Sequence, residues 1–423
     1  MLPVCNRSGT WISFFDALFT ATSATCVTGL VVFDTYTQFT CLGQAVILLL
    51  IQVGGLGFMS LALFFPLVLR RRIGLKERSF LMEALSTQQL GGVVRLVKHL
   101  LCGTFLVELL GALLLMTRFV PAFGLPQGAW YAVFHSVSAF CNAGFDLMGR
   151  FSPYASLAPF AGDAVVNLTI CALIVIGGIG FIVWEDVLQH GLQLRRYSFH
   201  ARVVLLASAV LILSGTALFY LTERRGLLAG LPLGQQLLRA LFLSVSPRTA
   251  GFNTVDMGAL SSSGYLLTVL FMFIGAAPGS TGGGIKVTTF AVIVMTILSF
   301  SSGRENTVIL KRRIDHKTVY KALTISALAL VVVFITSSVM FYSIPRSEFN
   351  TPINAIFEAC SAFGTVGLSD GLTGEGNALT HIITMLTMFI GRVGPASLAI
   401  SLASGRGGRK KNQVMPEGKV LVG

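Results

Sequence analysis

Long apolar stretches alternate with shorter polar connections along the whole chain. An apolar run near 20 residues matches the roughly 30 Å hydrocarbon core of a bilayer. No connection between the runs is large enough to form a soluble domain. The pattern therefore predicts an all-α polytopic membrane protein with seven spanning segments. These lie at 42–69, 100–117, 164–184, 203–221, 266–276 continuing to 287–300, 322–342 and 382–403.

A shorter pattern occurs four times. In each copy an amphipathic stretch ends in a serine, and a glycine follows six residues later, or five in the third copy. The glycines are Gly29, Gly144, Gly251 and Gly367, at separations of 115, 107 and 116 residues. Near-constant spacing indicates internal repeats. We assign repeats to 1–72, 73–190, 191–303 and 304–404, followed by a tail at 405–423.

Each glycine is followed by an apolar segment that is itself interrupted by glycines. A repeat therefore consists of an outer spanning helix, a short helix, a loop and an inner spanning helix. The first repeat begins almost at its short helix, at Phe14, so we expect it to lack its outer helix. This arrangement places the N-terminus outside, and we expect a truncated gene model as its cause.

Composition and charge support a membrane location and give an orientation. Only 12% of the 423 residues are charged, against about a quarter in soluble proteins. Segments 70–98, 185–202, 301–321 and the residues from 404 onward carry 21 of the 31 Lys and Arg residues. The positive-inside rule makes these segments and the C-terminus cytoplasmic. The net charge of +13 thus orients the chain in lipid, and we expect no nucleic-acid binding.

Four loops at membrane depth, each behind a short helix, are typical of a cation filter. Non-helical backbone is tolerated there only inside protein or beside a water-filled cavity. Rings of backbone carbonyls replace the water shell of a potassium ion. Glycine adopts the required dihedrals without a Cβ penalty, and the short helices aim their negative ends at the ion path. The alternative is that these glycines only permit close helix packing.

The segments CVTGL, NAGFD, RTAGFN and GTVGLS resemble the loops of the Trk/Ktr/HKT potassium transporters, most closely the KtrB type. The resemblance extends to the terminal PEGKVLVG. It implies potassium uptake across the cytoplasmic (inner) membrane, a homodimer with one pore per subunit, a cytosolic nucleotide-binding regulatory subunit of KtrA/TrkA type, and Na⁺ as an activator. It also implies filter carbonyls from Val27, Thr28, Gly29, Asn142, Ala143, Gly144, Thr249, Ala250, Gly251, Thr365, Val366 and Gly367.

The third inner segment is interrupted at 275–286 by a glycine-rich stretch with one proline. A continuous helix is costly there. A phosphate-binding loop does not fit, since Ile285 stands where that motif needs lysine. We interpret the stretch as a flexible break, and the resemblance implies an intramembrane gate. The predicted gate residues are Gly275, Pro278, Gly279, Gly282, Gly283, Gly284, Lys286 and Arg392.

Several charged residues lie at membrane depth, where charge is usually functional. Arg392 is expected to form an electrostatic barrier below the filter and to pair with carbonyls of the glycine-rich stretch, or else to be neutralised in a helix interface. Arg248 is expected to brace the third loop through its carbonyls, Lys286 to reach the cytoplasmic interface, and Glu108 to be hydrogen-bonded between helices. Acidic residues on the outer side, including Asp34, Asp146 and Glu358, predict a cation-concentrating vestibule.

Three other classes of protein remain to be weighed. A secondary active cation symporter with alternating access also uses repeats and broken helices, but it typically has two inverted halves. The six histidines are scattered and the seven cysteines form no CxxC pair, so we expect no enzyme, disulfide framework or resident metal. A purely structural membrane protein would not need glycines in four matching positions.

Overall fold

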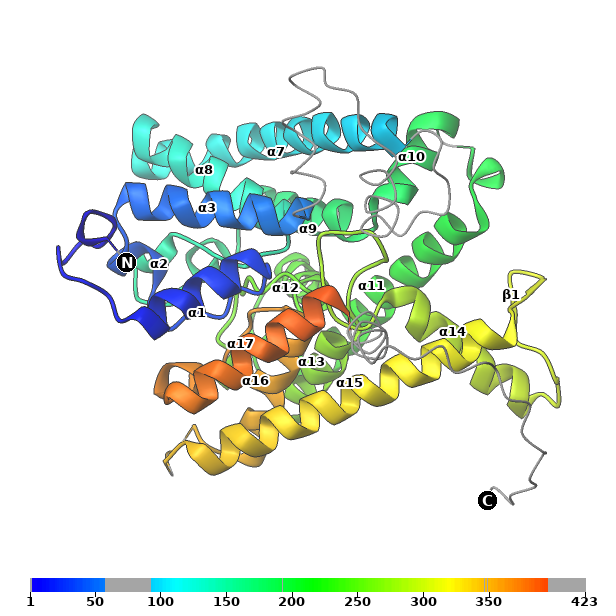
Figure 1. Cartoon of the computed structure of the whole chain (residues 1–423). Helices are drawn as coiled ribbons and strands as arrows, with labels where there is room; N and C mark the ends of the chain where they lie inside the picture. Colours follow the sequence, from blue (N-terminus) through cyan, green and yellow to red (C-terminus); the bar gives the residue numbers. More distant parts are fainter. Residues whose placement is uncertain (1, 58–92, 192, 346, 348, 395–423) are drawn as a thin grey trace.

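The computed structural model describes residues 2–57, 93–191, 193–345, 347 and 349–394. The elements of these residues are helical apart from one short hairpin (Figure 1). Parts of the predicted repeats, at 58–72, 73–92 and 395–404, and the whole predicted tail lie outside the described residues. We call the face carrying the connection between α14 and α15 the inner face, following the orientation that the charge pattern predicts.

The main helices are α1 (Phe14–Thr25), α2 (Thr35–Gln38), α3 (Cys41–Leu56), α7 (Val93–Phe123), α8 (Leu125–Phe140), α9 (Ala164–Gly178), α10 (Phe181–His190), α11 (Phe199–Glu223), α12 (Leu233–Val245), α13 (Ser262–Phe273), α14 (Val287–Ser301), α15 (His316–Ser343), α16 (Pro352–Gly364) and α17 (Ala378–Val393). Strands β1 (Val308–Ile309) and β2 (Arg312–Arg313) pair antiparallel between α14 and α15.

Three helices of the described part, α7, α11 and α15, are long and apolar enough to cross a bilayer alone. In the most apolar 18-residue stretch of α7, α11 and α15, only 39%, 33% and 28% is buried, respectively. Large apolar side chains, among them Leu106, Leu213 and Phe334, stay exposed on them. Surfaces of this kind are stable against lipid tails rather than water. The prediction of an all-α polytopic membrane protein is therefore confirmed.

The helices pack in a cyclic order that follows the sequence repeats. Each inner helix contacts the short helix of the next repeat: α3 lies against α8, α9 against α12, α13 against α16, and α17 against α1. The last contact joins the two ends of the described chain, and Figure 1 shows α17 beside α1. Four units joined in this closed order surround a common axis.

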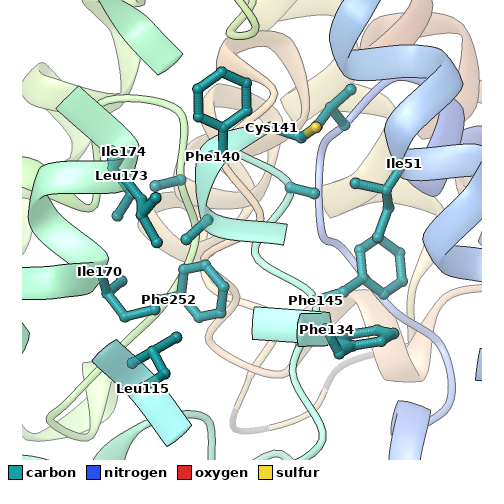
Figure 2. Packing of buried hydrophobic residues seen from close by; sticks show 14 of the residues in the cluster. Ile51, Leu115, Phe134, Phe140, Cys141, Phe145, Ile170, Leu173, Ile174 and Phe252 are labelled. Carbon is teal, nitrogen blue, oxygen red and sulfur yellow. The ribbon is translucent and has the colours of Figure 1, made fainter. Parts of the chain in front are cut away.

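A continuous apolar core holds the first two units together. It includes Phe134 and Phe140 of α8, Phe145 of the following loop, and Phe252 from the third unit, each at most 1% exposed. Figure 2 shows these rings gathered with Ile51, Leu115 and Ile170 from the surrounding helices. Dense aromatic packing of this kind resists small displacements. The loops that follow the short helices therefore rest on a rigid wall.

Two inner segments are broken within the described residues. The break between α13 and α14, at residues 274–286, agrees with the flexible interruption expected there. The run 164–184, expected as one span, is instead bent by 97° between α9 and α10. Gly180 stands at this bend with φ of +90°, a conformation that glycine adopts without a Cβ penalty. The glycines that interrupt this segment in the sequence thus coincide with a bend, whose size the sequence did not predict.

Candidate functional site

The four short helices α1, α8, α12 and α16 each end at an equivalent loop. The residue two positions before each repeat glycine is not glycine, yet it has a positive φ: 57° at Val27, 59° at Asn142, 76° at Thr249 and 50° at Thr365. The repeat glycines follow with φ between 70° and 94°. Left-handed backbone at non-glycine residues persists only where the surroundings enforce it. Its recurrence at four matched positions marks one functional element rather than four separate turns.

The serine that ends each amphipathic stretch anchors its own loop. The Oγ atoms of Ser23 and Ser361 accept the amide N–H of Gly29 and Gly367, each at 3.1 Å. Ser138 Oγ instead donates to the Phe145 carbonyl at 2.7 Å, and Ser246 Oγ donates to the Phe252 carbonyl. The four serines are buried. The sequence pattern contained these serines, but their role as anchors needed the coordinates.

The loops contact one another in the same cyclic order as the helices. A Cβ added to Gly29 would lie 2.3 Å from the Ala143 carbonyl oxygen, and one on Gly144 would lie 2.6 Å from that of Ala250. A Cβ added to Gly251 would lie 2.1 Å from the Val366 carbonyl oxygen. One further contact, between the fourth loop and the first, closes the ring. A Cβ on Gly367 would lie 2.2 Å from the Thr28 oxygen. We call these loops, 27–29, 142–144, 249–251 and 365–367, the four-loop ring.

The ring thus brings together all twelve residues predicted as filter residues. Side chains add one cross-link that the sequence did not predict, since the Asn142 amide and the Thr249 hydroxyl share a hydrogen bond of 2.9 Å between the second and third loops. The assignment of these residues to ion binding stays a prediction. Arg248 makes no hydrogen bond to a loop carbonyl among the described residues, so its expected bracing role is not seen.

Residues 274–286, which we call the crossing loop, are closed at their base. Ile274 and Ile285 form a bridge, with the Gly275 amide donating to the Ile285 carbonyl at 2.7 Å. The Val287 amide donates to the Ala276 carbonyl at 3.1 Å. The loop therefore leaves and re-enters the helical wall at one point, and its middle is free to reach the other repeats.

The middle of the crossing loop lies against the four-loop ring. The Gly283 amide donates to Thr365 Oγ1 at 3.0 Å, and the Thr281 hydroxyl donates to the Phe140 carbonyl at 3.2 Å. A Cβ added to Gly282 would lie 2.2 Å from Thr249 Oγ1. Thr249 and Thr365 thus provide hydroxyl contacts to the crossing loop in addition to their predicted carbonyl role. The glycines allow the two backbones to approach this closely.

The bend in the second repeat receives the other side of the crossing loop. The Phe181 amide donates to the Gly279 carbonyl at 2.8 Å, and the Ala277 amide donates to the Gly178 carbonyl at 2.9 Å. The bend leaves backbone groups of α9 and α10 without partners in their own helices, and unpaired groups are costly inside a membrane protein. The crossing loop, about 100 residues away in the sequence, supplies these partners and so accounts for the bend.

Two cations hold the crossing loop. The Arg392 guanidinium donates to the Thr281 carbonyl of the crossing loop, and also to the Gly54 and Gly55 carbonyls at the end of α3, the last at 3.1 Å. Lys286 Nζ donates to the Gly282 carbonyl at 2.7 Å. Lys286 therefore turns back into the loop, and its expected extension to the cytoplasmic interface was wrong. The guanidinium fork suits this contact, since it presents several donors in fixed geometry.

The family model described as a cation transport protein, TrkH, matches residues 4–406. The chain belongs to the TrkH family. Among curated relatives, the Ktr system potassium uptake protein B of Bacillus subtilis (strain 168) is 40% identical over all of this chain and 92% of its own length. The protein of the same name from Vibrio alginolyticus is 39% identical over 95% of this chain and 87% of its own.

A solved structure supports the same fold. The potassium transporter TrkH from Vibrio parahaemolyticus superposes with a TM-score of 0.69, covering 92% of this chain and 78% of that chain, at 21% identity. The resemblance inferred from the loop motifs is therefore confirmed, and this TrkH-family chain is a membrane transporter component. The potassium/sodium uptake protein NtpJ of Enterococcus hirae is 37% identical over all of this chain.

A cavity of about 250 Å³ opens above the four-loop ring of this TrkH-family chain. The four repeat glycines form its floor, and Asp34 and Asp146 line its wall. Asp34 is held by the Thr37 amide at 2.8 Å and the Tyr154 amide at 3.0 Å. Carboxylates at the entrance of a narrow path raise the local cation concentration. The expected acidic vestibule is thus represented by these two residues.

Glu358 does not face this cavity as expected. It is fully buried and accepts hydrogen bonds from Ser369 Oγ at 2.5 Å, Thr373 Oγ1 at 2.7 Å and the Asp370 amide at 3.2 Å. His135 holds the matching place in the second repeat, where its Nε2 accepts the Leu147 amide at 3.4 Å. Both side chains fix the residue three positions after a repeat glycine. They brace the exits of the second and fourth loops.

Replacing Glu358 with alanine should destabilise the fold. The change leaves two hydroxyls and one amide without their acceptor, and removing a buried partner of this kind costs about 3 kcal/mol. The thermal unfolding midpoint of the purified protein measures the loss. The Glu375→Ala variant is the control, because Glu375 is exposed and accepts one bond, from Ser347. Equal midpoints for the two variants would contradict the bracing role.

The vestibule should be sensitive to outside pH through Asp146. Burial raises the pKa of Asp146 to about 7, the Met148 amide opposes this, and the nearby Asp34 carboxylate adds to it. The side chain is therefore charged above this pH and neutral below it. Going from about pH 8 to about pH 6 should raise the KM for rubidium uptake about twofold, the effect of one charge at moderate distance in water.

The Asp146→Asn variant should have the higher KM at both pH values. The Asp256→Asn variant serves as its control, because Asp256 is an exposed carboxylate of the outer loops. A KM of the Asp146→Asn variant that still doubles on acidification would assign the titration to another group.

Proposed function

We propose that the protein takes up potassium across the cytoplasmic membrane, with the four-loop ring as its selectivity filter and the crossing loop as its gate. The cyclic contact of four matched loops carries this proposal, because a closed ring of left-handed backbone supplies carbonyls around one axis. The names of the relatives, which are potassium uptake proteins, support the choice of ion.

The proposal includes the assembly and orientation implied by the loop motifs. The protein functions as a homodimer, with its C-terminus in the cytoplasm and a cytosolic nucleotide-binding subunit of KtrA/TrkA type. Sodium acts as an activator, in keeping with the name of the potassium/sodium uptake relative. The protein catalyses no chemical reaction, and potassium is its substrate.

A secondary active symporter is the second candidate. Alternating access requires a site that closes on one side before it opens on the other, usually between two halves of the protein. The crossing loop is bonded directly to the second and fourth repeats, and through Arg392 to the first, which favours gating at one point rather than rocking of two halves.

Growth of potassium-uptake-deficient cells at limiting potassium tests the function. Cells expressing the chain together with its regulatory subunit should grow, while cells expressing the subunit alone should not. Absence of growth, with the protein present in the membrane fraction, would reject potassium uptake.

Rubidium flux into vesicles of the purified complex separates the two candidates. A pore conducts down the rubidium gradient alone. A symporter needs a second ion gradient, so flux that requires an imposed sodium or proton gradient would favour the symporter.

A further inference from the structure

A second cavity, of about 370 Å³, lies on the inner side of the crossing loop. Its walls are the N-terminal parts of α11, α14 and α15 and residues Ile309 and Ile314 between α14 and α15, together with Pro278 and Lys286 of the crossing loop. It shares no lining residue with the cavity above the four-loop ring. Ion conduction through the ring does not require it, so it needs a separate explanation.

The polar part of this cavity suits an anion. Lys286 and Lys321 line it, and none of the described lining residues is acidic. His200 also lines it, and its Nε2 is buried with no hydrogen-bond partner among the described residues. Asp186 is not a lining residue. Its carboxylate accepts hydrogen bonds from the Ser198 amide at 3.0 Å and from the Ser198 hydroxyl at 2.6 Å.

The start of α14 adds to this preference. Lys286 is the residue before the helix and provides no side-chain cap. Thr288 and Thr289, in the first turn, line the cavity. The Val287 amide is already bonded to the Ala276 carbonyl, but the Thr288 and Thr289 amides have no hydrogen-bond partner among the described residues. These amides and the dipole of a 15-residue helix favour negative charge. Two ammonium groups and this helix end therefore act on the same space.

The remaining wall is apolar and close to lipid. Phe199, Val203, Val292 and Ile325 contribute hydrocarbon surface that a small hydrated anion would not use. Beside Lys321, Tyr320 and Leu323 are 67% and 46% exposed on a helix that crosses the bilayer. A tyrosine next to a lysine at a helix end is typical of the membrane interface. The occupant should therefore carry both a negative headgroup and an acyl chain.

We propose that this cavity binds the headgroup phosphate of an anionic phospholipid, and that binding favours the open position of the crossing loop. Lys286 provides the link, because its Nζ holds the Gly282 carbonyl of the crossing loop at 2.7 Å. A phosphate in the cavity competes with that carbonyl for the ammonium. Release of Gly282 loosens the part of the loop that contacts Thr249 of the ring. The effect on gating rests on the proposed function, whereas the binding does not.

Two measurements test the proposal on the full chain with its regulatory subunit. The first is retention of phosphatidylglycerol by the purified protein, read by native mass spectrometry. The second is rubidium flux in vesicles of phosphatidylcholine alone and of phosphatidylcholine with phosphatidylglycerol. The Lys321→Gln variant removes one cavity ammonium. Lys317→Gln is its control, one turn earlier on the same helix, exposed and outside the lining.

Phosphatidylglycerol should be retained by the wild type and the Lys317→Gln variant. Retention by Lys321→Gln should fall about fivefold, the contribution of one cation near an anionic surface. Flux should rise with phosphatidylglycerol in the first two proteins and less in Lys321→Gln, with equal flux for all three in phosphatidylcholine alone.

The possible failures differ from one another. Equal retention by both variants would overturn the lipid site. Retention without any rubidium flux would reject the pore while leaving the lipid site. Displacement of the lipid by inorganic phosphate, with flux raised in phosphatidylcholine alone, would identify a free phosphate compound as the ligand and overturn the lipid assignment.

Discussion

Potassium uptake is expected to fall at least tenfold, to a level near background, when Gly251 is replaced by alanine. The new Cβ would lie 2.1 Å from the Val366 carbonyl oxygen, so the fourth loop of the ring has to move away. Gly251 also has φ of +75°, which costs an L-residue roughly 1–2 kcal/mol. Because each 1.4 kcal/mol is about a factor of ten, strain and displacement together account for the loss. Initial rubidium uptake by potassium-depleted cells measures it.

The Gly230→Ala variant is a matched control for this experiment. Gly230 has φ of +76°, nearly the same as Gly251, but nothing lies within 4 Å of the added Cβ. The control therefore carries the backbone strain without the collision in the ring. It should retain uptake close to that of the wild type at equal amounts of protein in the membrane. Comparable loss in both variants would assign the effect to strain, and normal uptake by Gly251→Ala would contradict the filter.

The ring could be predicted from the sequence because its signal is local and repeated. A few neighbouring residues determine a helix end that is followed by a left-handed residue and a glycine. Four copies at similar spacing made this pattern specific. The order of contact around the axis needed the coordinates. That order comes from inner helices such as α3 and α13 packing on the short helix of the next repeat.

Features that depend on distant partners were missed or misjudged. The bend at Gly180 follows from hydrogen bonds to the crossing loop, and glycines in an apolar run are equally compatible with an unbroken helix. Glu358 was expected in the vestibule because it lies on the outer side of the sequence pattern. Its burial results from donors 11 to 15 residues later that fold back over it. Sequence position predicted a side of the membrane for Glu358, but the direction of its side chain needed tertiary contacts.

Arg392 connects the ends of three repeats. It lies in α17 of the fourth unit and contacts a carbonyl of the crossing loop in the third unit and two at the end of α3 in the first. The sequence allowed three roles: an electrostatic barrier, pairing with carbonyls of the glycine-rich stretch, or a charge neutralised by packing. The contacts agree with the pairing, in which the guanidinium fastens the crossing loop to the opposite wall. Charge-assisted hydrogen bonds contribute about 1.5–3 kcal/mol each, enough to bias a gate toward its closed position.

Rubidium leak through the protein without its regulatory subunit should therefore rise about tenfold or more in the Arg392→Gln variant, since losing even one such bond exceeds 1.4 kcal/mol. Arg392→Lys separates fastening from charge, because one ammonium retains the charge but cannot reach carbonyls of two different repeats in the geometry of the fork. If Arg392 fastens the loop, both variants leak in vesicles of the purified protein. If Arg392→Lys stays as tight as the wild type while Arg392→Gln leaks, the positive charge alone closes the path. If neither leaks, Arg392 has no part in closure.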